Sequence, residues 1–111
     1  MPIPEEHRKL IDQDSWFERC CRCSKPGVQI HHVFIYGKNQ IAEMFNYVPA
    51  CPKCHEKATP HNNNYKQEAR DYFEWVVLQR AEIEDLAKYP KKDWQNHIRY
   101  LLIQADKHNW K

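Results

Sequence analysis

Glycine, long apolar runs and an excess of one charge are what this 111-residue sequence has least of. Its two glycines, Gly27 and Gly37, are too few for a glycine-rich phosphate-binding loop. No apolar run approaches the roughly 20 residues of a membrane span. The N-terminal segment is polar and acidic where a signal peptide would be apolar. We therefore expect a cytoplasmic protein that does not associate with membranes.

The charge is balanced, because 17 basic and 15 acidic residues give a net charge of +2. Bulk charge therefore does not identify a nucleic-acid-binding protein. Leu, Ile, Val and Phe make up about 20% of the chain, at the lower edge for a packed core, although four Trp and six Tyr add large buried areas. We expect a single small domain over residues 1–111 that requires a crosslink.

The first half of the chain predicts a mixture of helices and strands. Pro4 is typical of a helix start, and Leu10, Ile11 and Phe17 are spaced to face inward from a short helix over residues 5–18. The β-branched and aromatic run over residues 28–36 predicts a strand, with a loop at 37–39 and a second short strand at 47–50. A helix carrying His55 is expected to begin near residue 52.

Residues 62–111 predict two helices, the first capped by an asparagine at 62, 63 or 64 and ended by Tyr89-Pro90. Asp93 can cap the second helix. Each helix has an apolar stripe, formed by Tyr65, Ala69, Tyr72, Phe73, Val76, Arg80 and Ile83 in the first and by Trp94, Ile98, Leu101, Leu102 and Ala105 in the second. These stripes predict core packing, but they can also pair between chains, so both a monomer and a homodimer are open.

Four of the five cysteines form two pairs, Cys20-x-x-Cys23 and Cys51-x-x-Cys54. A two-residue spacing lets two thiolates converge on one tetrahedral ion, and four such ligands make a closed structural zinc site. Buried free cysteines, or disulfides in an exported protein, are the alternatives. Cys21 can replace Cys20 as a ligand, although its spacing to Cys23 is tighter than usual.

Four histidines lie between the cysteine pairs or shortly after the second pair. His31 and His32 are adjacent in the expected strand, so their side chains should point to opposite faces and have different roles. One can bind a metal while the other acts as a base. His55 directly follows the second cysteine pair, and His61 lies six residues further on.

The order of these residues resembles that of the HNH endonucleases, members of the ββα-metal (His-Me finger) nuclease superfamily. The resemblance spans about residues 20–62 and consists of the first cysteine pair, His31-His32, Asn46, and the second pair followed by His55. It is closest to small phage and prophage HNH proteins. It implies a small α+β fold with a zinc-stapled ββα-metal core of a β-hairpin and a helix over residues 19–62. An N-terminal helix and a helical extension over residues 63–111 would flank this core.

The resemblance also implies a role for each residue. His32 would be the general base that activates water, and Asn46 would fix the loop that orients it. His31, His55 and His61 would bind a catalytic divalent cation, namely Mg, Mn, Ni or Zn. The four cysteines would hold a separate structural zinc.

Two features depart from the family pattern. Ile35 stands where many members have a proline, three residues after the base. The last metal ligand is often three or four residues after the helix histidine, where this sequence has Ala58 and Thr59. His61 is the remaining candidate for this ligand.

The substrate implied by the resemblance is DNA, whose phosphodiester bonds the protein would hydrolyse. Candidate phosphate contacts are Arg22, Lys38, Lys53 and Lys57, although ordinary surface charge explains them equally well. Without a long basic stripe, we expect modest, salt-sensitive binding. The alternative function is a non-catalytic zinc-binding module that binds nucleic acid or protein. Such a module would act as an accessory to another phage or recombination protein, or in DNA packaging.

Overall fold

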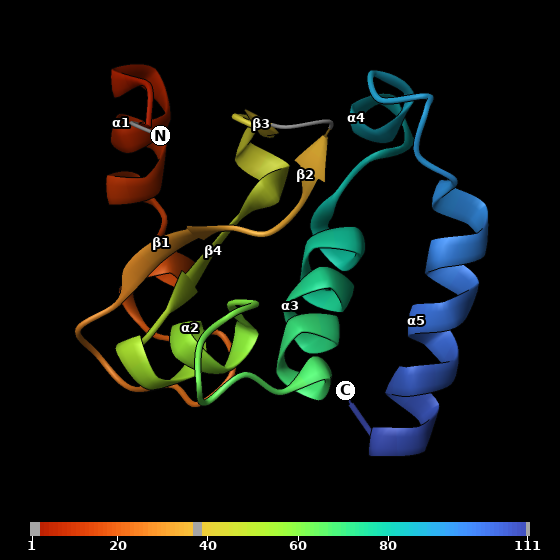
Figure 1. The fold of residues 1–111 in the computed structure, drawn as a ribbon. Coiled ribbons are helices and arrows are strands. Elements are labelled where there is room, and N and C mark those ends of the chain that lie inside the picture. Colours follow the sequence, from red (N-terminus) through yellow and green to blue (C-terminus); the bar gives the residue numbers. More distant parts are fainter. Residues whose placement is uncertain (1–2, 37–38, 111) are drawn as a thin grey trace.

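The structure is a computed structural model that describes residues 3–36 and 39–110 (Figure 1). Within these residues it is a small α+β fold with five α-helices, a two-stranded sheet and a separate short hairpin. The elements in chain order are α1 (Glu5–Gln13), β1 (Gln29–His32), β2 (Ile35–Tyr36), β3 (Asn39–Gln40), β4 (Tyr47–Ala50), α2 (Pro52–Ala58), α3 (Gln67–Arg80), α4 (Ile83–Ala87) and α5 (Trp94–His108).

The central sheet pairs β1 with β4 in antiparallel register, with His31 opposite Val48 and His32 opposite Tyr47. All four residues of β4 are buried, and the strand predicted at 47–50 is confirmed. The strand predicted over 28–36 is only partly correct, because the chain leaves the sheet at Val33 and Phe34 before β2. Both of these side chains enter the core instead. Of the loop predicted at 37–39, residues 37 and 38 lie outside the described residues.

Asn46 closes the loop that joins β1 to β4. Its side-chain oxygen accepts a hydrogen bond from the Phe34 N–H at 2.7 Å, and its amide nitrogen donates to the carbonyls of Phe34 at 3.1 Å and Ile41 at 2.9 Å. The Asn46 side chain is fully buried. Buried backbone groups require hydrogen-bond partners. The Asn46 side chain supplies them for this loop, as a neighbouring strand does within a sheet.

The N-terminal helix is shorter than the segment predicted at 5–18. Asp14 is extended, and its carboxylate accepts a hydrogen bond from the Trp16 N–H, which begins a 3-10 helix over Ser15–Glu18. Ile11 and Phe17 are buried as predicted, but the inward position predicted for Leu10 is wrong because its side chain is half exposed.

The C-terminal half contains three helices instead of the predicted two. A capping box between Glu82 and Asp85 starts α4 at Ile83, so Ile83 does not continue the stripe of α3 and is 83% exposed. The predicted asparagine cap is also wrong, since Lys66 precedes α3 without a side-chain cap. The Asp93 cap of α5 is confirmed by its hydrogen bond from the Asn96 N–H at 3.1 Å.

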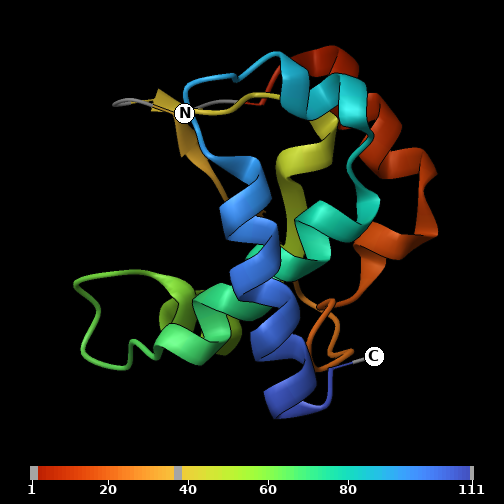
Figure 2. The ribbon, with the colours of Figure 1, turned by 90° about the vertical axis from the view of Figure 1, so that its right-hand side faces the viewer.

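Helix α3 lies at the centre of the molecule, between α2 and α5 (Figures 1 and 2). Phe73 and Val77 on α3 are fully buried in the main core with Val48 of the sheet. On the other side, Leu101 of α5 packs in a cluster with Trp75. No helix in the described part of the chain is both long and apolar enough to cross a bilayer.

The Asn46 contacts predict a large loss of stability on truncation. Asn46→Ala removes three buried hydrogen bonds and leaves the Phe34 N–H and the Ile41 carbonyl unpaired, while the Phe34 carbonyl keeps the Ile41 N–H as a donor. We therefore expect the free energy of unfolding to fall by about 2–4 kcal/mol. Urea denaturation followed by circular dichroism measures this. Asn64→Ala, at an exposed asparagine, should change it by no more than about 0.5 kcal/mol. Equal midpoints for both variants would contradict the structural role of Asn46.

Candidate functional site

Four cysteine side chains converge between the segment before β1 and the start of α2. The sulfur atoms of Cys20, Cys23, Cys51 and Cys54 all lie within 4.8 Å of one another, and those of Cys23 and Cys51 are 3.4 Å apart. Three of the four residues are buried and Cys23 is exposed. All five cysteines lie in the described residues and none of them forms a disulfide.

This donor set suits a zinc ion. Tetrahedral ligation with Zn–S bonds of about 2.3 Å places sulfur atoms about 3.8 Å apart, close to the spacing found here. Four thiolates leave no open coordination position, which is typical of a structural site. The four cysteines can therefore hold a metal ion such as zinc.

Cys21 is not part of the cluster. Burial raises the pKa of its thiol to about 12, and the neighbouring Cys20 adds to this, so Cys21 stays protonated at neutral pH. Its backbone carbonyl accepts a hydrogen bond from the Tyr72 hydroxyl on α3 at 3.1 Å. Of the two alternatives for the first ligand, the geometry favours Cys20.

A second group of donors faces a cavity of about 240 Å³ between β1, α2 and α3. His31, His32 and His55 all line it. The rings of His31 and His55 meet edge to face with their centres 4.7 Å apart, and the ring of Phe73 on α3 lies 5.7 Å from that of His31. The antiparallel sheet followed directly by α2 thus brings histidines from a strand and a helix to one place.

Burial sets the protonation of the strand histidines. It lowers the pKa of His31 to about 4, and the nearby His55 lowers it further. Burial also lowers the pKa of His32. Both imidazoles are therefore neutral at pH 7, which is the form that binds a metal ion or accepts a proton.

The His32 ring is held mainly by packing. It meets the Tyr47 ring edge to face with centres 4.9 Å apart, and the Tyr47 hydroxyl is 2.7 Å from Nδ1 of His7. Nε2 of His32 is buried and has no hydrogen-bond partner among the described residues. The fold therefore does not use this nitrogen, and Asn46 fixes the loop that begins directly after His32.

His61 is not brought to this cavity. It is exposed, has a positive φ of 74° and is absent from the cavity lining, which instead includes Thr59 and Pro60. The Thr59 hydroxyl donates to the His55 carbonyl at 2.7 Å. Within the described residues, the four cysteines form the one group of three or more His, Cys, Asp or Glu donors close enough to share an ion, so His31 and His55 stand as a pair.

The basic residues proposed as DNA contacts are dispersed. The Arg22 guanidinium is paired with Glu68 and lies over the Tyr72 ring, and both partners belong to α3. Lys53 and Lys57 line a different cavity, of about 340 Å³, together with Asn63, Asn64, Tyr65, Lys66 and Glu56. Lys38 lies outside the described residues. The phosphate contacts therefore remain predictions.

Arg70 on α3 is a site residue that the sequence did not indicate. It lines the cavity with His31, His32 and His55, although it lies outside the segment that resembles the HNH family. In the sequence it is one of many charged residues on an amphipathic helix. Only the packing of α3 against α2 brings it to the histidines.

The chain matches no protein-family model, no curated protein and no solved structure, so the role of these residues is inferred from their geometry.

The cysteine cluster predicts that metal binding and folding are coupled. Purified protein should contain about one equivalent of zinc, and Cys51→Ser should lose it together with helical circular dichroism, because zinc binding contributes folding free energy. Cys21→Ser is the matched control and should retain the metal. A folded Cys51→Ser protein with a full zinc content by mass spectrometry would contradict a four-cysteine site.

Proposed function

We propose that the protein is a metal-dependent endonuclease of the HNH type that hydrolyses DNA phosphodiester bonds. The observation that carries this proposal is the meeting of His31, His32 and His55 at one cavity, with Asn46 closing the loop after His32. These are the residues whose order resembles the family. A non-catalytic zinc module would require the cysteines but none of these four.

His32 is the proposed general base. Burial keeps it neutral at pH 7, and a neutral imidazole at the cavity wall can accept a proton from a water molecule as that water attacks phosphorus. Tyr47 fixes the ring by edge-to-face packing, while Asn46 holds the adjoining backbone. A positioned base of this kind contributes about 10²–10⁴-fold to the rate.

His31 and His55 are the proposed ligands of the catalytic cation. Both line the cavity with their ring centres 4.7 Å apart, and two protein ligands leave coordination positions open for substrate. When bound, a divalent cation stabilises negative charge on the phosphate and on the leaving 3′ oxygen. The antiparallel strands β1 and β4, followed by α2, support the proposal, because a ββα-metal core consists of two strands followed by a helix.

The donor set favours particular cations. Among the described residues, no carboxylate lines the cavity, and imidazole ligands suit Zn and Ni better than Mg. We therefore expect Ni or Zn to support cleavage at lower concentrations than Mg. Mn and Mg remain candidates at higher concentrations.

Nicking of supercoiled plasmid by the wild-type protein and by His32→Ala tests the proposal. With added Ni²⁺ we expect the wild type to nick, and the variant to be slower by at least about 100-fold because it lacks the base. His108→Ala removes an exposed histidine at the end of α5 and should nick at the wild-type rate. His32→Gln, which keeps a polar side chain, replaces the alanine variant if that variant does not fold.

Two outcomes would count against the enzyme. A folded His32→Ala protein with unchanged nicking would remove His32 from the mechanism. A wild-type protein that carries zinc but does not nick DNA with any of the cations tested would favour the accessory role. In that role the protein binds nucleic acid or another phage or recombination protein without cleaving DNA.

A further inference from the structure

We infer that Arg70 binds a phosphodiester group of the DNA substrate and that Glu74 orients the Arg70 guanidinium. Helix α3 would then complete the site formed by the sheet and α2. This inference rests on the proposed nuclease function. Neither residue belongs to the segment that resembles the HNH family.

The charge of the cavity favours an anionic ligand. Among the described residues that line it, Arg70 is the one with a permanent charge, and none is acidic. The lining therefore has a permanent positive charge at Arg70 and no negative charge to offset it. The Arg70 side chain is 38% exposed, which leaves it accessible to a ligand entering from solvent.

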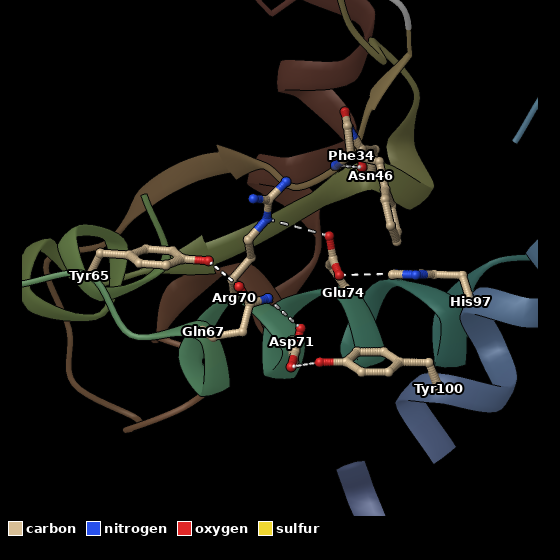
Figure 3. A network of polar contacts seen from close by, with 9 residues as sticks. All are labelled: Phe34, Asn46, Tyr65, Gln67, Arg70, Asp71, Glu74, His97 and Tyr100. Carbon is tan, nitrogen blue, oxygen red and sulfur yellow. Dashed lines mark hydrogen bonds and ion pairs between the residues drawn. The ribbon is translucent and has the colours of Figure 1, made fainter. Parts of the chain in front are cut away.

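Glu74 restricts the Arg70 guanidinium without using all of its hydrogen-bond donors. The Arg70 Nε atom lies 3.6 Å from a Glu74 carboxylate oxygen, one helical turn away. Figure 3 shows the two terminal nitrogens of Arg70 directed away from this carboxylate. Within the described residues, Nε is the one side-chain atom of Arg70 for which a partner is found. The terminal nitrogens can therefore form the paired hydrogen bonds with which arginine binds phosphate.

Glu74 is itself fixed by α5. Its side chain is only 7% exposed, and its other oxygen lies 2.9 Å from Nε2 of His97 on α5. A second polar contact joins the same two helices, because the Tyr100 hydroxyl donates to Asp71 at 2.7 Å (Figure 3). A buried carboxylate between an arginine and a histidine is well placed to orient the arginine and costly to leave unpaired. The helical extension thus has a role at the site besides packing.

The dependence of DNA binding on salt tests the phosphate contact separately from cleavage. The probe is a fluorescein-labelled DNA duplex in EDTA, and its affinity is measured by fluorescence anisotropy between about 50 and 200 mM salt. Arg70→Ala should weaken binding and lower the slope of log K against log salt by about 0.9, the value for one phosphate contact. Arg99→Ala is the matched control, since it removes the same charge from an exposed position on α5 and should leave the slope unchanged.

Two further variants separate charge from geometry. Arg70→Lys keeps the charge but not the fork, so it should retain the salt slope and yet cut plasmid about tenfold more slowly. Glu74→Gln keeps Arg70 and removes the carboxylate that orients it. It should also retain the slope and lower kcat more than it raises KM. If Arg70→Ala does not fold, Arg70→Gln, which keeps the aliphatic stem, takes its place.

The outcomes distinguish this inference from the proposed function. If the wild type nicks DNA but Arg70→Ala matches Arg99→Ala in slope and rate, the inference is overturned and the nuclease remains. If the wild type binds the duplex but does not nick DNA with any of the cations tested, the proposed nuclease function is overturned. The slopes of the two alanine variants then still decide whether Arg70 contacts phosphate. A wild-type protein that does not bind the duplex overturns both.

Discussion

The convergence of four cysteine sulfurs is the constraint on which the rest of the site depends. It ties the segment before β1 to the first turn of α2, and these two segments are far apart in the sequence. In a chain with a small apolar content, a metal ion held there would supply folding free energy that the core does not. His55 lies one residue after Cys54, so the crosslink also determines where His55 meets His31. The cysteine cluster and the pair of histidines thus share helix α2.

The rest of the site is held by side-chain polar contacts, one in the loop after β1 and one between two helices. Asn46 takes the place of ladder hydrogen bonds in the loop after His32, and Glu74 and His97 link α3 to α5 beside Arg70. Asn46 and Glu74 are buried and His97 is partly buried, and all three are paired, so each contact fixes one local geometry. The cavity is consequently bounded by three separately secured walls, namely the sheet with its loop, helix α2 and helix α3.

Local signals in the sequence were sufficient for the parts of the fold that depend on neighbouring residues. The strand at Tyr47–Ala50, the start of α2 at Pro52 and the Asp93 cap follow from β-propensity, proline geometry and side-chain capping. The break at Phe34 could not be predicted because it depends on a distant amide. The separate helix α4 depends on the capping box between Glu82 and Asp85, which the apolar periodicity of this segment does not reveal. The approach of Arg70 to the histidines depends on the packing of α3 on α2, which no local pattern contains.

The metal dependence of DNA cleavage tests the central claim, a closed cysteine site beside an exchangeable histidine site, most directly. Protein dialysed briefly against EDTA is assayed for plasmid nicking before and after Ni²⁺ is added, and its zinc content is measured in parallel. The account predicts that the dialysed protein retains its zinc, does not nick, and nicks once Ni²⁺ is restored. Nicking that persists in EDTA would contradict this account. So would a zinc-loaded protein that does not nick DNA with any added cation.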